Sequence, residues 1–162
     1  MAHLGIAQET KLDIEFEHEW TLSKFLNIHV TGKGTRKFEA RTPYVHSGTL
    51  DLTINLQGKI LHVDFIEKNE KEDMNTFFKL LAMETDGLWN PVNVPNGTES
   101  VHVIIPILYR TKPEFDKDDR PDLIQQFQEY HQGLNISQLE VCKNSPCALK
   151  PETLIVTYPS VR

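Results

Sequence analysis

Cysteine and long hydrophobic runs are both scarce in this sequence. Its 162 residues contain only two cysteines, and charged or amide side chains interrupt every apolar stretch. A membrane-spanning helix needs about 18 or more apolar residues, so we expect no membrane span in this chain. Because 39% of the residues are hydrophobic, the chain is long enough to fold as one domain around its own core.

Clusters of basic residues are also missing. The sequence has 17 Lys and Arg residues against 23 Asp and Glu residues, which gives a net charge of -6. The longest basic run is Arg36-Lys37, which is too short to follow a phosphate backbone. We therefore expect no nucleic acid among the partners of this protein.

The usual sequence motifs of catalytic and metal sites are absent as well. The seven histidines form neither a His-x-x-x-His nor a His-Glu-x-x-His pair, and no Gly-x-Ser-x-Gly motif is present. His18 lies among three glutamates, but alternation along a strand would place it on the face opposite to them. We predict no catalytic residue, no metal site and no cofactor. An enzyme whose catalytic residues are distant in the sequence is the alternative.

The two cysteines, Cys142 and Cys147, are separated by Lys-Asn-Ser-Pro, which favours a turn. We predict a disulfide between them, which is typical of an oxidising compartment, and two free thiols are the alternative. Residues 1–8 are either the end of a secretory leader, cut after Ala7, or a disordered N-terminus. The leader and the disulfide together predict a periplasmic or secreted protein.

The most regular part of the sequence predicts a β-hairpin followed by a helix. Apolar and polar residues alternate in 50–57 and again in 59–67, where Leu61, Val63 and Phe65 share one face, and Gly58 makes the turn. A capping box of Asn69 and Glu72 is predicted to begin the helix, and Gly87 to end it. The predicted common core consists of Leu52, Ile54, Val63, Phe65, Met74, Phe77, Phe78, Leu81 and Trp89.

A third strand, rich in β-branched residues, is predicted over 101–109. Pro106 has no N–H to donate, so its side of this strand must be an edge, a bulge or a non-bonded position. The three strands and the helix predict an α+β fold, with a small antiparallel sheet in a ββαβ core over 50–110. Residues 9–49 form an N-terminal extension, and residues 111–162 add a helix and a last strand.

Four short motifs accompany the ββαβ order: Gly58-Lys59, Trp89-Asn90-Pro91, Asn96-Gly97 and Ile105-Pro106-Ile107-Leu108-Tyr109. With them, the segment 50–110 resembles the C-terminal domain of TonB-type energy transducers, of the divergent kind found in Bacteroidota. A transducer also needs an inner-membrane anchor and a long Pro-rich spacer, and this sequence contains neither. We therefore expect a free-standing relative of this domain rather than an energy transducer.

Domains of this family bind an extended segment of an outer-membrane receptor along a sheet edge, whose unpaired N–H and C=O groups accept the added strand. The resemblance implies a non-enzymatic protein-binding module with an envelope protein as its partner. It also implies that the third strand is the binding edge, with residues His102, Val103, Ile104, Ile105, Ile107, Leu108 and Tyr109. A small-ligand carrier is the rival interpretation, although the central helix interrupts the strand meander of a barrel.

Overall fold

The fold is α+β, and the computed structural model describes residues 12–30, 45–111, 125, 129, 135–150 and 153–157. The main sheet contains β3 (Ile60–Glu67), β2 (Val45–Asn55), β5 (Ser100–Thr111) and β6 (Cys147–Leu149) as neighbours in that order, and β7 (Thr153–Thr157) also pairs with β5. A second, antiparallel sheet joins β1 (Asp13–Phe16) to β4 (Trp89–Val92). The two sheets share one hydrophobic core.

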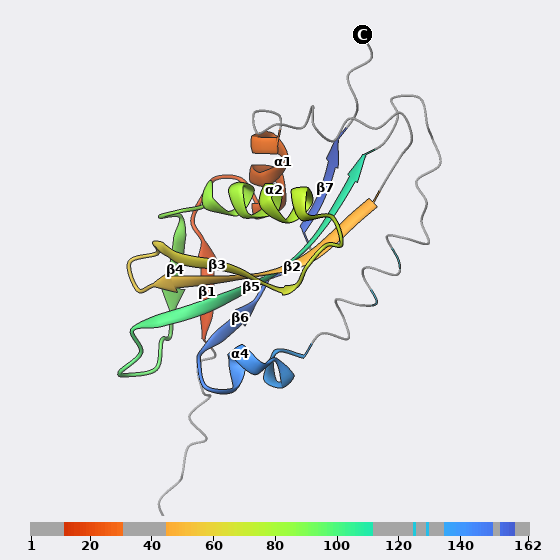
Figure 1. The fold of residues 1–162 in the computed structure, drawn as a ribbon. Helices are drawn as coiled ribbons and strands as arrows, with labels where there is room; N and C mark the ends of the chain where they lie inside the picture. Colours follow the sequence, from red (N-terminus) through yellow and green to blue (C-terminus); the bar gives the residue numbers. More distant parts are fainter. Residues whose placement is uncertain are drawn as a thin grey trace, which may run out of the picture.

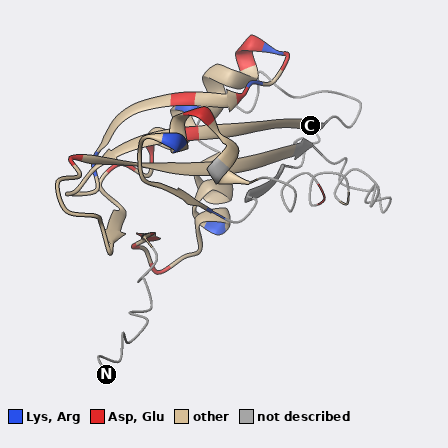
Figure 2. Ribbon diagram, turned by 90° about the horizontal axis from the view of Figure 1, so that it is seen from below, with Lys and Arg blue, Asp and Glu red and all other residues tan. Residues whose placement is uncertain are grey.

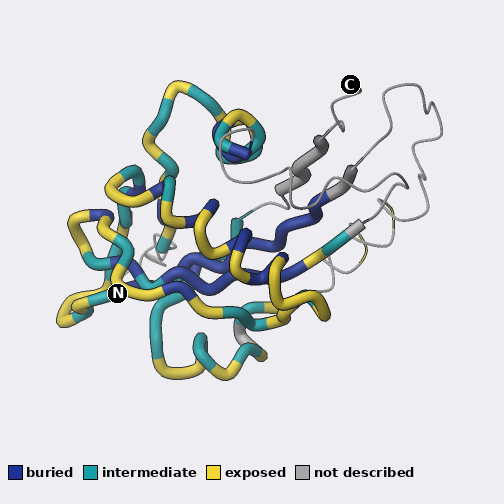
Figure 3. The backbone as a smooth tube through the Cα atoms, turned by 45° about the horizontal axis from the view of Figure 1, so that its top comes forward, coloured by how far each residue is buried: buried dark blue, intermediate teal, exposed yellow. Residues whose placement is uncertain are grey.

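The helices lie on both sides of the main sheet. Helices α1 (Leu22–Val30) and α2 (Glu72–Met83) lie above it in Figure 1, whereas the short helices η2 (Ile136–Gln138) and α4 (Glu140–Lys143) lie below. The buried residues gather in the middle strands and on the sheet-facing sides of α1 and α2 (Figure 3). None of the described helices is long and apolar enough to cross a membrane.

The predicted hairpin is confirmed as β2 and β3, with one correction. The N–H of Asn55 donates to Lys59 O at 2.9 Å, and Gly58 has the left-handed backbone (φ 85°) that glycine adopts without steric cost. The register shifts between Thr53 and Ile54, which leaves Leu61 as an extra residue in β3. The prediction that Leu61 shares the core face is therefore wrong, and its side chain is 59% exposed.

Helix α2 is confirmed with its predicted apolar stripe, but the predicted capping box is wrong. The N-cap residue is Lys71, and it makes no side-chain cap hydrogen bond. Asn69 instead accepts the N–H of Lys71 at 2.8 Å and exchanges hydrogen bonds with the buried Asn75. A local turn at Asn69 thus replaces the reciprocal cap, because the side chain of Asn75 already occupies the N–H of Asn69.

Trp89 of β4 belongs to the shared core. It is buried against Phe16 of β1, with ring centroids 5.2 Å apart, and its indole N–H donates to Thr85 Oγ1 at 2.9 Å. The core predicted around Trp89 is confirmed, except that Phe65 is only partly buried. The sequence predicted neither the pairing of β4 with β1 nor helix α1, which buries Phe25, Leu26 and Val30.

The C-terminal extension is described in part. Strand β7 confirms the predicted last strand over Thr153–Thr157. The predicted leader over residues 1–8, and most of the predicted helix near residues 123–131, lie outside the described residues, although Gln125 and Glu129 are helical.

Candidate functional site

Strand β5, the predicted binding edge, lies inside the main sheet. It pairs with β2 along its whole length, from Val45 opposite Arg110 to Asn55 opposite Ser100. Its other side pairs in parallel with β6 at 102–104 and with β7 at 107–111. The prediction that β5 offers an open edge is therefore wrong. Its predicted edge residues are buried, apart from the half-buried His102: Val103, Ile104, Ile105, Ile107, Leu108 and Tyr109.

Pro106 lies where one parallel partner ends and the other begins. The register with β6 ends at Ile104, and the register with β7 begins at Ile107. On its other side, Pro106 lies opposite Thr49 of β2. The residue that cannot donate thus lies between two ladders, which is one of the positions that the sequence allowed for it.

His102 makes a polar contact across the sheet instead of facing a partner. Its Nδ1 lies 2.7 Å from Asp51 Oδ1 and 3.5 Å from Thr53 Oγ1. Asp51 is buried, and the imidazole gives its carboxylate a hydrogen-bond partner. Cys147 lies opposite His102 in β6 but is held in a disulfide, so it is not a nucleophile for this histidine.

The predicted disulfide between Cys142 and Cys147 is confirmed. It joins α4 to β6, which is attached to β5 by two further hydrogen bonds of 2.9 Å, from His102 N–H to Pro146 O and from Lys150 N–H to Ile104 O. The disulfide is consistent with an extracytoplasmic protein. Among the described residues, no group of three His, Cys, Asp or Glu side chains is arranged to hold a metal ion.

Strand β3 forms one edge of the main sheet, and β6 and β7 form the other. In the described chain it pairs with β2 and has no strand on its other side. Two of its outward N–H groups are bound by carboxylates at 2.8 Å: Ile60 donates to Asp86 Oδ1, and Phe65 donates to Asp64 Oδ1. Strand residues two apart point their N–H groups the same way, so the N–H of Val63 also points outward, between the two carboxylates.

An apolar groove of about 300 Å³ runs beside this edge, and we call it the β3 groove. Its walls are residues 60–63 of β3 and Lys79, Leu80 and Met83 of α2. Three of its large apolar side chains are unusually exposed: Leu61 at 59%, Leu80 at 53% and Met83 at 45%. The ammonium group of Lys79 lies 5.5 Å from the centre of the Phe65 ring, close to the groove. An exposed apolar patch of this kind is typical of an interaction surface.

Two apolar residues of α2 that lie outside its buried stripe were a sequence signal for the β3 groove. The buried stripe of α2 contains Met74, Phe77, Phe78 and Leu81, and neither Leu80 nor Met83 belongs to it. These two residues are three positions apart, so they share a second helix face. Apolar residues outside the core stripe could have identified this face as a candidate surface.

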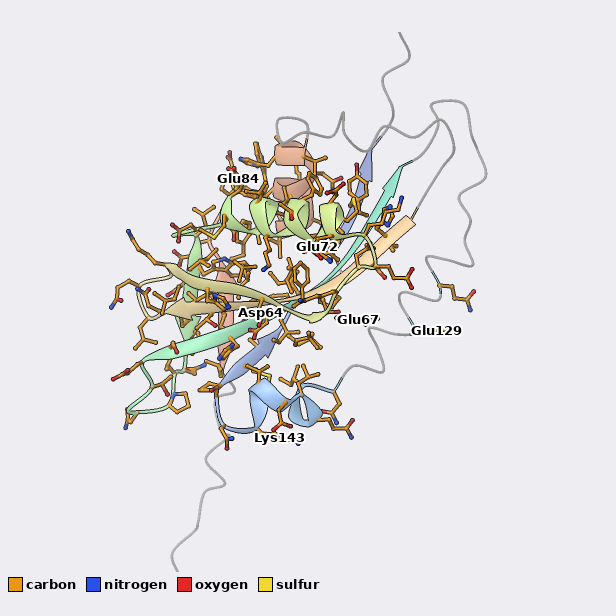
Figure 4. The ribbon with its side chains drawn as sticks, viewed as in Figure 1. Asp64, Glu67, Glu72, Glu84, Glu129 and Lys143 are labelled. Carbon is orange, nitrogen blue, oxygen red and sulfur yellow. A yellow bond between two sulfur atoms is a disulfide. The ribbon has the colours of Figure 1, made fainter. Side chains whose placement is uncertain are left out.

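Figure 4 labels acidic residues on or next to the two elements that form the β3 groove. Asp64 lies on β3, Glu67 ends that strand, and Glu84 lies at the C-terminal end of α2, next to Met83. Outward main-chain donors and exposed apolar side chains therefore lie along the same strand edge, and the carboxylates of Asp64 and Asp86 accept two of those donors. Comparisons of the whole chain with protein-family models, with curated proteins and with solved structures find no match.

Proposed function

We propose that this chain is a non-enzymatic protein-binding module that recruits an extended partner segment as an added strand on the β3 edge. The observation that carries the proposal is the open edge of β3, lined on one side by the exposed side chains of Leu61, Leu80 and Met83. The resemblance of residues 50–110 to the TonB C-terminal domain implies the same mode of binding. The site proposed here is on β3 and not on β5.

The two parts of the site have different roles in this proposal. Hydrogen bonds between the partner backbone and β3, beginning at the outward N–H of Val63, supply affinity that depends little on the partner sequence. Alternate side chains of the added strand enter the β3 groove and bury the exposed parts of Leu80 and Met83, which supplies selectivity. The partner is therefore an extended segment with apolar residues at every second position.

The disulfide supports a cellular compartment for this function. A bond between Cys142 and Cys147 persists in an oxidising compartment, so we place the protein in the periplasm or outside the cell. The partner is then an envelope protein, such as a segment of an outer-membrane receptor. A small-ligand carrier is less well supported, because about 300 Å³ is the lower limit for ligand pockets and the β3 groove is open along a strand.

The proposal is tested by selecting short peptides from a random library against the intact, disulfide-bonded chain. The selected peptides are then measured against three variants whose folding is checked by circular dichroism. Val63→Pro removes an outward donor and should weaken binding at least about ten-fold, since an added strand loses a hydrogen bond and meets the proline ring. Leu80→Ser should weaken it by a similar factor through loss of apolar contact.

Leu56→Ser is the matched control, because Leu56 is 41% exposed in the hairpin turn but does not line the β3 groove. This variant should bind the peptides with parental affinity. The proposal fails if no peptide is selected, or if folded Val63→Pro and Leu80→Ser variants bind as tightly as the Leu56→Ser control. Selective binding of compact organic molecules in place of peptides would favour the ligand carrier.

A further inference from the structure

Two carboxylates occupy the edge where the partner strand is proposed to bind. Asp86 Oδ1 accepts the N–H of Ile60, and Asp64 Oδ1 accepts the N–H of Phe65, each at 2.8 Å. Both aspartates are exposed, and they come from different elements, because Asp86 lies in the turn after α2 and Asp64 lies on β3 itself. The outward N–H of Val63 lies between the two occupied donors.

From this arrangement we infer that the partner segment carries basic side chains on both sides of an apolar centre. The inference rests on the proposed function, because it concerns the same edge and names the chemistry of its occupant. An added strand that pairs with the whole of β3 must displace both carboxylates from their N–H groups. Each displaced carboxylate then lies beside the partner backbone, partly shielded from water.

The basic side chains follow from the cost of that displacement. A carboxylate that loses a hydrogen bond and part of its hydration needs a new partner, since an unpaired charge near an interface is unfavourable. A Lys or Arg of the partner next to Asp64, and another next to Asp86, would supply it. A neutral segment leaves both charges uncompensated, and an acidic segment adds repulsion.

Charges elsewhere on the chain favour the same occupant. The net charge is -6, and acidic residues outnumber basic ones along the described elements (Figure 2). Such a field attracts cationic segments and raises their association rate. Lys79 is the only Lys or Arg in the groove lining, and its ammonium group lies 5.5 Å from the centre of the Phe65 ring.

A second copy of this chain is a poorer occupant of the edge. Two β3 edges that meet would bring together four carboxylates from Asp64 and Asp86, and each copy adds its own charge of -6. Like charges at an interface disfavour association. The carboxylates thus protect the edge from pairing with itself while they select a cationic partner.

The test uses three synthetic peptides with the same apolar, alternating centre, taken from the library selection, and with Lys, Ser or Glu at the positions flanking it. Their affinities for the intact chain are measured by calorimetry at low and at ordinary salt. We expect the Lys peptide to bind about five-fold more tightly than the Ser peptide, and the Ser peptide to bind more tightly than the Glu peptide. Added salt should reduce these differences.

The double variant Asp64→Asn with Asp86→Asn separates charge from hydrogen bonding, because each amide oxygen can still accept the backbone N–H. In this variant the preference for the Lys peptide should fall to less than about two-fold. The matched control is Asp73→Asn with Glu99→Gln, which removes the same charge from two exposed residues that do not line the β3 groove, and the preference should persist there.

The outcomes distinguish this inference from the proposed function. Equal affinities of the three peptides, with Val63→Pro still blocking each of them, would overturn the cationic partner but leave strand addition standing. Absence of binding by every peptide would overturn both. Dimerisation of the chain, seen by sedimentation and lost in Val63→Pro, would identify a second copy as the occupant and would also overturn the inference.

Discussion

The β3 margin of the main sheet is built by a tight hairpin, whereas the opposite margin is assembled from β6 and β7, which arrive from the far end of the chain. At the β3 margin, in the described residues, only side chains meet the outward N–H groups. At the other margin, backbone groups of the same chain meet those of β5, and a disulfide fastens the first of the two strands. Strand β5 is therefore covered on that side by β6 and β7, whereas β3 has no strand beyond it in the described residues and is the edge that we propose for a partner.

The largest predicted difference in stability is between substitutions of two side chains of α2, the helix that covers the β3 margin. Phe78 is fully buried between the helix and the sheet, whereas Leu80 faces the β3 groove. Phe78→Ala should lower the free energy of unfolding by about 3–5 kcal/mol, because it leaves a cavity. Leu80→Ala should change it by less than about 0.5 kcal/mol. Denaturant titration measures both, and similar losses would mean that Leu80 belongs to the core.

The next prediction concerns the hairpin turn that builds the β3 margin. A Cβ at Gly58 would lie 2.0 Å from the carbonyl oxygen of Trp89, and the residue has a φ of 85°. Gly58→Ala should therefore cost about 3 kcal/mol, the sum of backbone strain and displacement of β4. Gly97 also has a positive φ, of 81°, but has open space around it, so Gly97→Ala should cost only about 1 kcal/mol.

Thermal unfolding measures both variants. Equal losses of stability in Gly58→Ala and Gly97→Ala would contradict the close contact between the hairpin turn and β4. A larger loss of stability at Gly58 would show that the second sheet supports the β3 margin.

The opposite margin is tested by removing its disulfide. A double variant, Cys142→Ser with Cys147→Ser, should lose about 2 kcal/mol, the chain-entropy value for so short a loop. Hydrogen exchange should quicken at Lys150, which donates to Ile104 O, and at His102, which donates to Pro146 O. Exchange at Asp64 in β3 should be little affected by comparison. Equal acceleration at both margins would mean that they unfold as one unit.

The smallest predicted effect is a dependence of the free energy of unfolding on pH. It arises at His46 in β2, the strand between β3 and β5. Burial, and then the charge of Lys71, lower the pKa of His46 below 6.5, although a hydrogen bond with Asn69 opposes them. The unfolded chain then binds more protons than the folded chain as the pH falls below 6.5. Stability from His46 is fully present above this pH and is lost on acidification through the lowered pKa.

His46→Gln should remove this part of the pH dependence, since glutamine does not titrate. Denaturant titrations of both proteins at several pH values between neutral and mildly acidic provide the measurement. If the free energy of unfolding of His46→Gln changed with pH as steeply as that of the parent, the pH dependence would belong to other groups.

Local pattern was enough to predict the parts of the fold that are close in sequence. The hairpin, the apolar stripe of α2 and the last strand all follow from periodicity and from turn residues such as Gly58. Periodicity could not reveal that β4 pairs with β1, because Trp89 and Phe16 are distant in sequence and β4 is only four residues long. It also could not locate the bulge at Leu61, which depends on the register with β2.

The candidate site was predicted less well than the fold, for a related reason. A strand such as β5 has the same sequence pattern whether its second neighbour is solvent, a partner or the chain itself. Only the long-range pairing with β6 and β7 closes that side. The edge with an exposed apolar surface beside it is instead β3, and the exposed Leu80 and Met83 were the available sequence signal.

Nuclear magnetic resonance of the isotope-labelled chain with a selected peptide tests whether the β3 edge is the recognition surface. We expect close contacts between backbone protons of the peptide and those of Val63, together with protection of the Val63 amide from exchange. We also expect shifted side-chain signals of Leu80 and Met83 and little change in β5. Peptide contacts at β5, with β6 or β7 displaced and Val63 unprotected, would contradict recognition at the β3 edge.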